Sequence, residues 1–173
     1  MSDARYWNPT TVRQLERDSI RRFLEEHKEY LHGTVLDWGC GRQPYRDIVL
    51  SAGGTYYGYD RPDLPGSVVD LAVIPEQWAA DTILMTQVIQ YAPDPWSMLL
   101  TVKNSLVEGG FLVMTGPGNW AEVESADLHR FTKAGIRDLL HKCGYRVIIL
   151  KNRASIDLNG FELSLGWGLV ATV

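Results

Sequence analysis

The sequence predicts an α/β protein whose central sheet is doubly wound and mainly parallel, with helices on both faces. Short apolar runs alternate along the chain with segments in which apolar residues recur at helical spacing. Acids or turn residues bound most of the short runs, as is usual for strands. Regular alternation of strands and helices is typical of βαβ units, and these build parallel sheets.

Each element follows from its local pattern. A first amphipathic helix is expected over 11–31 behind the capping candidates Thr10 and Thr11, and Gly33 should end it. Three further segments with helical spacing are expected as helices: Tyr45–Ala52, Trp96–Val107 and Lys133–His141. The apolar runs expected as strands are Val35–Asp37, Tyr56–Asp60, Val68–Leu71, Thr82–Thr86, Phe111–Thr115, Arg146–Leu150 and a final strand within Gly160–Val173.

Composition limits the classes of protein that the chain can represent. At 173 residues, with 45% hydrophobic and 22% charged residues, it suits a single domain. The net charge is −4, and the basic residues of the N-terminal third alternate with acids, which indicates a solvated helix face and no nucleic-acid surface. No apolar run resembles a signal peptide or a membrane span. We therefore expect a soluble, cytoplasmic protein.

The two cysteines, Cys40 and Cys143, lie far apart in the sequence. We expect reduced thiols, since a disulfide framework needs more cysteines at closer spacing. No cysteine or histidine cluster has the spacing of metal ligands, so no metal site is expected.

The first predicted strand ends in Asp37 and continues into the turn Gly39-Cys40-Gly41. Glycines let the backbone approach a ligand closely, and doubly wound sheets bind ligands at the carboxyl ends of their strands. Asp60 ends the next predicted strand, 19 residues after Gly41 (60 − 41), which is the spacing of an acid that binds ribose hydroxyls. The two strand ends together indicate a ligand that contains a nucleoside.

Pro44 stands where a dinucleotide-binding turn has its third glycine. Proline has no backbone N–H, so one donor for a pyrophosphate is missing. S-adenosylmethionine contains adenosine but no phosphate, and its ammonium and sulfonium groups attract acids such as Asp37 and Asp60. These residues therefore favour S-adenosylmethionine as the ligand.

The chain resembles the class I S-adenosylmethionine-dependent methyltransferases, and among them a small branch whose first loop reads GCGxxPY. The segments that carry this resemblance are LDWGCGRQPY, YYGYD, VVDL, DTILMTQVIQYAPDP, LVEGGFLVMTGP and DLHRFTKAGIRDLLHKCGYRV, and they span residues 33–150. The resemblance implies a Rossmann-like sheet of seven strands in the order 3-2-1-4-5-7-6, with the last strand antiparallel beside the sixth. It also implies a methyltransferase domain at 33–173, preceded by a helical segment at 1–32 that covers the cofactor and substrate.

The resemblance also implies which residues bind the cofactor and that S-adenosylhomocysteine is the product. The methionine end would lie near Asp37, Gly39 and Gly41, and the ribose on Asp60. The adenine would lie beside Asp70 and Leu71, and the sulfonium beside Thr86, Gln87 and Val88. The turn residues Cys40 and Tyr45, together with Arg61, complete the predicted set. The usual family run Gln-Val-Leu-Glu-His reads Gln87-Val88-Ile89-Gln90-Tyr91 here, so an acid and an imidazole are replaced.

The segment 116–131 is longer than most connections, and we expect it to form a binding loop. If the acceptor is a hydroxyl, His129 is the candidate general base, because an unperturbed imidazole has a pKa of about 6.5. The alternative is that His129 and Arg130 anchor this loop against the sheet. Tyr6 and Trp7 are the other material from which a small lid over an acceptor could form.

We expect a small-molecule or glycan acceptor and no nucleic acid, since the chain lacks a basic composition and a motif for holding a flipped base. A monomer or homodimer is expected. Two alternatives remain open. One is a noncatalytic S-adenosylmethionine-binding subunit on the same frame, which Gln90 and Tyr91 favour. The other is an NAD-dependent oxidoreductase, which Pro44 disfavours.

Overall fold

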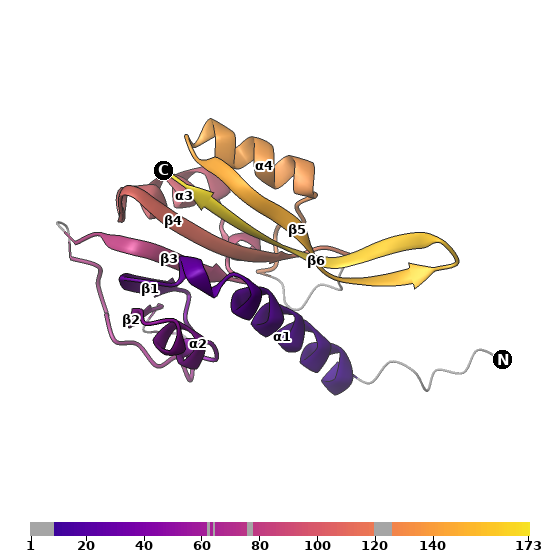
Figure 1. Ribbon diagram of the computed structural model, residues 1–173, viewed down its shortest axis with the longest axis horizontal. Helices are drawn as coiled ribbons and strands as arrows, with labels where there is room; N and C mark the ends of the chain where they lie inside the picture. The colour runs from indigo at the N-terminus through magenta and orange to yellow at the C-terminus, as the bar shows by residue number, and fades with distance from the viewer. Residues whose placement is uncertain (1–8, 62, 64, 76–77, 120–125) are drawn as a thin grey trace.

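The structure is a computed structural model, and it describes every residue except 1–8, 62, 64, 76–77 and 120–125. Its elements follow the chain in this order: α1 (Pro9–Glu26), η2 (Lys28–Tyr30), β1 (Thr34–Trp38), α2 (Arg46–Ser51), β2 (Thr55–Tyr59), β3 (Ala80–Thr86), η3 (Ile89–Tyr91), α3 (Pro95–Asn104), β4 (Leu106–Pro117), α4 (Lys133–Lys142), β5 (Arg146–Leu158) and β6 (Phe161–Thr172). Figure 1 shows the strands as one twisted sheet with helices on either side.

The described strands form a six-stranded mixed sheet in the order β2-β1-β3-β4-β6-β5. β1 pairs in parallel with β2 and β3, and β3 pairs in parallel with β4. β6 is antiparallel to both of its neighbours, β4 and β5. The predicted seven strands and the order 3-2-1-4-5-7-6 were therefore wrong, and the missing member is the predicted third strand.

The segment Val68–Leu71 does not form the predicted edge strand because only its last two residues bond to β2. The amides of Asp70 and Leu71 donate to the carbonyl of Gly58 over 2.8 and 3.0 Å, and one isolated bridge joins Leu71 to Tyr59. The amide of Val68 donates to the carbonyl of Gly41 over 2.8 Å, so the segment is tied to the turn after β1 instead of continuing along β2.

The last strand lies where it was expected, antiparallel and next to the strand that precedes it in the chain. A tight Asn159-Gly160 turn, with φ angles of +55° and +89°, reverses the chain between β5 and β6. Such turns favour antiparallel hairpins because their twist matches that of the strands. Leu169 pairs with Met114 of β4 on one side and with Leu150 of β5 on the other.

Two hydrophobic clusters cover the two faces of the sheet, because successive strand residues point to opposite faces. On one face, α1 and α2 pack against strand residues such as Val35, Leu84 and Val113. On the other face, α3 and α4 pack against their sequence neighbours, among them Leu36 and Met85. The first helix ends at Glu26, earlier than expected, and a short 3-10 turn leads into β1.

Side-chain caps begin two of the helices. The Asp94 carboxylate accepts hydrogen bonds from the amides of Trp96 and Ser97 at the start of α3, where Pro95 is the first helical residue. The Thr132 hydroxyl accepts from the amide of Gly135 at the start of α4. None of the described helices has the length and the apolar composition that a membrane crossing requires.

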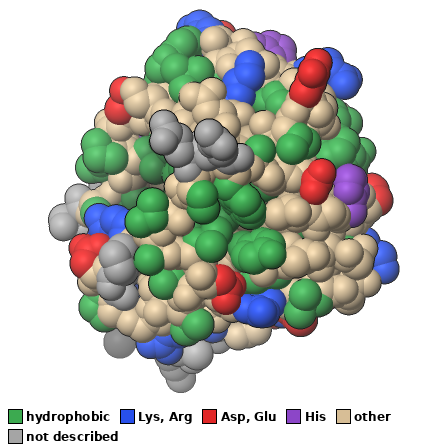
Figure 2. Space-filling model, turned by 90° about the vertical axis from the view of Figure 1, so that its left-hand side faces the viewer, with side chains coloured by type: hydrophobic (Ala, Val, Ile, Leu, Met, Phe, Trp, Pro, Cys, Tyr) green, Lys and Arg blue, Asp and Glu red, His purple; other side chains and the backbone are tan. Residues whose placement is uncertain are grey.

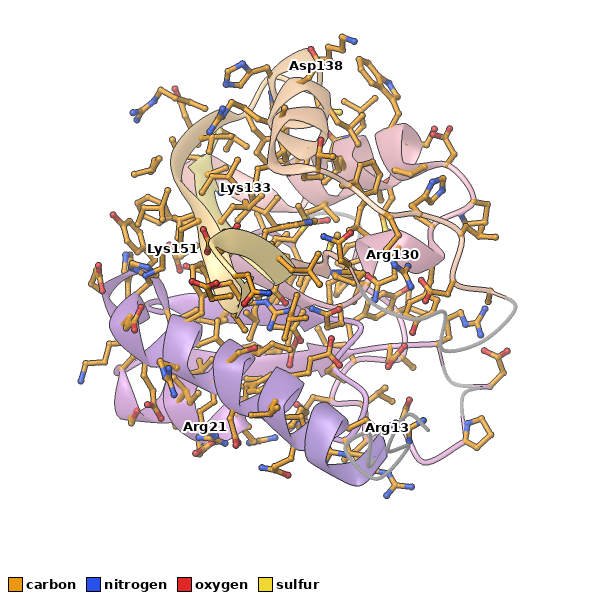
Figure 3. The ribbon with its side chains drawn as sticks, turned by 90° about the vertical axis from the view of Figure 1, so that its right-hand side faces the viewer. Arg13, Arg21, Arg130, Lys133, Asp138 and Lys151 are labelled. Carbon is orange, nitrogen blue, oxygen red and sulfur yellow. The ribbon has the colours of Figure 1, made fainter. Side chains whose placement is uncertain are left out.

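The two ends of the parallel strands carry different side chains. Figure 2 looks onto the end at which these strands begin, where hydrophobic side chains gather in the middle and charged ones are spread around them. Figure 3 looks onto the opposite end, where the strands terminate and where α1 begins. The residues singled out as candidate site residues follow the carboxyl ends of the strands, so this second end is the place to examine.

Candidate functional site

The turn after β1 is held close to the end of β2. The amides of Gly39 and Cys40 both donate to the carbonyl oxygen of Tyr59, over 2.7 and 3.1 Å. Gly39 has a φ of +77°, and a Cβ there would lie 2.5 Å from the Val88 side chain. Gly41 has a φ of +52°, and no atom lies within 4 Å of the place that its Cβ would occupy. Packing therefore requires glycine at position 39, whereas the space beside Gly41 is free for a ligand.

Asp37 is a buried carboxyl at the end of β1, with an exposed fraction of 1%. Its Oδ2 accepts a hydrogen bond of 2.6 Å from the Tyr56 hydroxyl, whereas its buried Oδ1 has no partner. Burial, and to a smaller extent the nearby Asp60, raise the pKa of this carboxyl to about 7, whereas the hydrogen bond from Tyr56 lowers it. A buried acceptor without a donor is costly, so this oxygen is a candidate contact for a ligand.

The Asp60 carboxylate, 8% exposed, binds the same turn. Its Oδ2 accepts from the amide of Gly41 over 2.9 Å and from the hydroxyl of Ser67 over 3.2 Å, and its Oδ1 accepts from the amide of Arg61 over 2.8 Å. A carboxylate offers about four acceptor positions. Three are in use, which leaves one on Oδ1 for an incoming hydroxyl.

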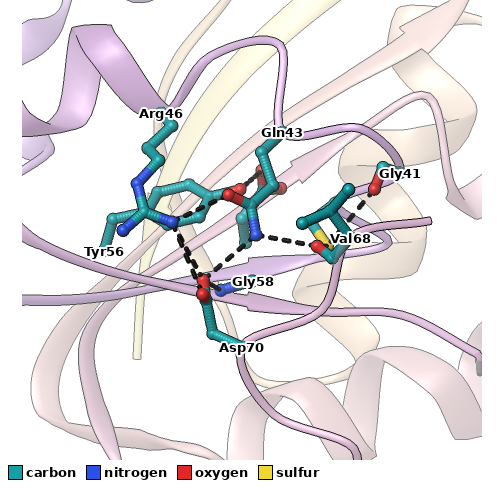
Figure 4. Close-up of polar contacts among 9 residues, drawn as sticks. Gly41, Gln43, Arg46, Tyr56, Gly58, Val68 and Asp70 are labelled. Atoms are coloured by element: carbon teal, nitrogen blue, oxygen red, sulfur yellow. Dashed lines mark hydrogen bonds and ion pairs between the residues drawn. The ribbon is translucent and has the colours of Figure 1, made fainter.

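Asp70 lies in a polar network beside the turn, drawn in Figure 4. Its Oδ2 accepts from the amide of Gly58 over 2.8 Å, from the Gln43 side chain over 3.1 Å and from the Arg46 guanidinium over 3.3 Å. The Gln43 amide group also donates to the carbonyl of Val68 over 2.7 Å. The network clamps the segment that was predicted as a strand onto the turn, and this explains its backbone path.

Three members of the predicted cofactor set lie away from the open part of the turn. Tyr45 is 5% exposed and belongs to the core cluster under α1, and burial raises its pKa to about 12. The Cys40 thiol is buried against the carbonyl of Val68, and burial raises its pKa to about 12, so it stays protonated. Arg61 is exposed and forms a surface ion pair with Asp63 at 3.6 Å.

Gln87 follows β3 in a left-handed conformation, with a φ of +56°. Non-glycine residues adopt this conformation at a cost and often do so at functional sites. Its amide donates to the carbonyl of Thr115 over 3.1 Å, and its side chain donates to the Thr115 hydroxyl over 3.3 Å. These bonds to β4 hold Gln87 at the carboxyl edge, between the β1 turn and the region beneath α1.

A cavity of about 180 Å³ lies at this edge, between the first half of α1, η3, the end of β4 and the segment that precedes α4. The residues that line it are Arg13, Glu16, Arg17, Gln87, Gln90, Tyr91, Pro117, Asp127 and Arg130. Figure 3 labels Arg13 on α1 and Arg130 on the segment before α4. Gln87 is the one predicted cofactor-binding residue in this lining, so it links the two halves of the site.

The chain from Asp127 to Phe131 is bound to η3. The amides of Leu128 and His129 donate to the carbonyl of Gln90 over 2.8 and 3.2 Å. The His129 Nε2 lies 2.9 Å from the carbonyl oxygen of Ala92, so the neutral ring donates there and carries its lone pair on Nδ1. The ring stacks on Phe131 and does not line the cavity. Trp120, Glu122 and Glu124, also in the predicted loop, fall outside the described residues, as do Tyr6 and Trp7.

Sequence reasoning missed how α1 is attached to the site. Arg153 of β5 donates from Nη1 to the Ser19 hydroxyl and to the carbonyl of Glu16, the latter over 3.4 Å. Burial lowers the pKa of Arg153 to about 10, against the opposing effect of Glu16. Gly166 is the sequence signal for the position of Arg153, since a Cβ at Gly166 would overlap the Arg153 guanidinium.

Glu16 faces the cavity from α1, and burial raises the pKa of its carboxyl against the lowering effect of four arginines. Among the residues that the structure describes, no group of three or more histidines, cysteines, aspartates and glutamates is arranged to hold a metal ion.

Comparisons with known proteins relate the chain to others by structure. No family model and no curated protein sequence matches it. An S-adenosylmethionine-dependent methyltransferase from Mesorhizobium loti superposes with a TM-score of 0.68 at 15% identity, covering 92% of this chain and 100% of the other. One from Archaeoglobus fulgidus gives a TM-score of 0.66 at 15% identity, covering 91% and 94%.

A third solved structure contains the cofactor. The magnesium protoporphyrin IX methyltransferase of Synechocystis, with bound S-adenosylmethionine, superposes with a TM-score of 0.63 at 15% identity, covering 99% of this chain and 86% of the other. The same enzyme is also known with bound S-adenosylhomocysteine. At these identities the likeness concerns the fold. The chain therefore has the fold of S-adenosylmethionine-dependent methyltransferases.

Proposed function

We propose that this protein transfers a methyl group from S-adenosylmethionine to a hydroxyl of a small-molecule or glycan acceptor and releases S-adenosylhomocysteine. The observation that carries the proposal is the buried Oδ1 of Asp37, which has no hydrogen-bond partner. Asp37 lies near the end of β1, beside a glycine turn that is open at Gly41. In the strand order, β2 and β3 lie on opposite sides of β1, so the turn stands at the switch point where such sheets bind ligands.

The residues present fit this cofactor. An ammonium group would supply the donor that Asp37 Oδ1 lacks. One ribose hydroxyl would take the remaining acceptor position of Asp60. Pro44 offers no N–H to a phosphate, which a dinucleotide would need and this cofactor does not. Thr86, Gln87 and Val88 would border its sulfonium end.

The cofactor, when bound, supplies a methyl group on positively charged sulfur. The residues of this chain would position the acceptor and move its proton. The cavity beside Gln87 would hold the acceptor, with the first half of α1 as its cover. We propose His129 as the base that takes the acceptor proton, with Nδ1 as the accepting atom because Nε2 is bonded to Ala92. The ring does not line the cavity in the structure, so this role requires it to come into contact with the acceptor when the acceptor binds.

A noncatalytic binding subunit remains the second candidate. It is favoured by Gln90 and Tyr91, which replace the acid and the imidazole of the family run. Both residues line the cavity. In this case the protein would bind the cofactor without turning it over.

Calorimetry with S-adenosylhomocysteine and with NAD tests the cofactor. We expect S-adenosylhomocysteine to bind and NAD not to bind. Asp37→Asn should weaken S-adenosylhomocysteine binding at least tenfold, whereas the exposed Asp63→Asn should not change it. Binding of NAD alone, or of neither compound, would refute the proposal. Methyl transfer from labelled S-adenosylmethionine to a panel of hydroxylated compounds then separates an enzyme from a binding subunit.

A further inference from the structure

Positive charge gathers around the cavity, although the chain as a whole has a net charge of −4. Three of the lining residues, Arg13, Arg17 and Arg130, are arginines, and two, Glu16 and Asp127, are acids. Arg13 and Arg17 are four residues apart on α1, so their side chains leave the same face of the helix. Arg130 reaches the cavity from the segment before α4 (Figure 3).

Asp127 is already paired within the protein, whereas Glu16 lies near four arginines that include Arg13 and Arg17. The Asp127 side chain is 2% exposed and accepts hydrogen bonds from both terminal nitrogens of Arg130. Glu16 lies in the field of four arginines, of which the partly buried Arg153 acts on it most strongly. By contrast, no carboxylate of the described residues lies within 4 Å of the guanidinium of Arg13 or Arg17. These two cations can accept an anion from outside.

A second feature of the cavity is an unpartnered polar atom in its lining. Gln90 is 3% exposed, and its Oε1 is buried without a hydrogen-bond partner. Its Nε2 makes a long bond of 3.4 Å to the Gln87 side chain. A free buried oxygen requires a donor, and a ligand hydroxyl would supply one. This position is next to Gln87, on the side where the proposed cofactor would present its methyl group.

On the basis of the proposed function, we propose that the acceptor is a small hydroxylated anion. Its hydroxyl would donate to Gln90 Oε1, and its carboxylate or phosphate would bind Arg13 and Arg17. Arginine is suited to both groups, because its planar donors match two oxygens at once. The cavity has a volume of about 180 Å³, which suits a small acceptor.

Binding of matched pairs of probes tests this inference. In calorimetry at fixed ionic strength, with S-adenosylhomocysteine present, 4-hydroxybenzoate is compared with 4-hydroxybenzamide, and glycerol 3-phosphate with glycerol. We expect at least one anion to bind tenfold or more tightly than its neutral partner. The anion that shows the preference identifies the carboxylate or the phosphate as the preferred group.

Variants assign the effect to the cavity. The double substitution Arg13→Gln and Arg17→Gln should remove the preference for the anion and leave S-adenosylhomocysteine affinity unchanged. Arg22→Gln, on the same helix and exposed but not in the cavity lining, should retain the preference. Gln90→Leu should weaken the hydroxylated anion at least fivefold but not affect benzoate, which lacks the hydroxyl.

The outcomes separate this inference from the proposed function. If S-adenosylhomocysteine binds and neither anion is preferred, the inference is wrong and the proposed function stands. If an anion is preferred equally by the parent and the double variant, the site lies elsewhere and the inference is also wrong. If the preference depends on the two arginines but S-adenosylhomocysteine does not bind, the anion site is confirmed and the proposed function fails.

Discussion

Arg153 donates from its Nε to the carbonyl oxygen of Trp167 over 3.1 Å, and the rest of its guanidinium spans the gap between the sheet and α1. Its other nitrogens reach the carbonyls of Gly116 and Glu16 and the hydroxyl of Ser19. One side chain therefore fixes the helix that carries Glu16 over the end of β4. This relationship decides where the cavity lies.

Replacing Arg153 should loosen this attachment. Arg153→Met keeps most of the volume but leaves the carbonyls of Trp167 and Gly116 without these donors. We expect a loss of about 1–3 kcal/mol in the free energy of unfolding, measured by urea denaturation. Hydrogen exchange in α1 should accelerate more than in α4. Equal acceleration in both helices would show that Arg153 does not act on α1 in particular, and Arg22→Met serves as the surface control.

Gly116 is required by the ring of Trp167. A Cβ at this position would overlap that ring, with Cε2 at 2.7 Å, and the ring is held because its Nε1 donates to the carbonyl of Phe131 over 3.0 Å. Gly116→Ala should destabilise the protein by about 1–3 kcal/mol through overpacking. Gly135→Ala, in the first turn of α4, should cost less, since its Cβ would meet only the Thr132 hydroxyl, at 3.3 Å. A melting temperature of Gly116→Ala equal to that of the parent would contradict the packing.

Asp37 should make the unliganded protein less stable as the pH rises. Its folded pKa of about 7 lies above the ordinary carboxyl value of 3.8, so the folded state binds the proton more tightly. Its contribution is thus fully present below about pH 4 and is lost as the pH rises to about 7. Between pH 5.5 and 7 this loss amounts to about 2 kcal/mol. Asp37→Asn should flatten the pH profile of unfolding, and the exposed Asp63→Asn should not.

The same carboxyl predicts how pH affects cofactor binding. If Asp37 receives the ammonium group as a carboxylate, S-adenosylhomocysteine affinity should increase up to about pH 7 and then level off. Calorimetry in buffers of different ionisation enthalpy would detect the proton released on binding. A flat affinity profile from pH 5.5 to 8 would mean that the Asp37 oxygen is not the contact.

Asp60→Asn tests the proposed ribose contact. A hydrogen bond to a charged acceptor contributes about 1.5–3 kcal/mol, so its loss should weaken S-adenosylhomocysteine binding more than tenfold. Because Asp60 also accepts from Gly41, Arg61 and Ser67, the melting temperature is measured in parallel. Ser67→Ala removes one of these internal bonds while keeping the carboxylate, and it should bind with nearly parental affinity. Unchanged affinity of Asp60→Asn would remove this residue from the site.

His129→Asn tests the proposed base. If Nδ1 takes the acceptor proton, turnover should fall by about 10² to 10⁴ while S-adenosylhomocysteine affinity stays the same. Loss of the Ala92 contact would by itself lower the stability by about 0.5–1.5 kcal/mol. A lower melting temperature with an unchanged rate per folded molecule would show that the ring is an anchor. His141→Asn, at an exposed position of α4, is the matched control.

Local patterns were sufficient for most of the elements. The apolar run that ends in Asp37 and the glycine turn after it follow from neighbouring residues, and so does the helix expected at Lys133–His141, which the structure has at Lys133–Lys142. The segment Val68–Leu71 has the same apolar appearance as a strand, yet its backbone bonds to Gly41 and Gly58. The Val68 amide bonds to the turn, whereas the amides of Asp70 and Leu71 bond to β2, and this division cannot be read from the segment itself.

The sequence by itself determined the order of strands and helices in the chain and the acids and glycines at the strand ends, because these depend on residues close together. The tertiary structure alone decided the cavity. Its walls join residues from both halves of the chain, and the bond between Arg153 and Glu16 connects positions 137 residues apart. Such contacts form only after the sheet has brought β5 beside α1, since no local periodicity encodes which distant side chains will share a buried space.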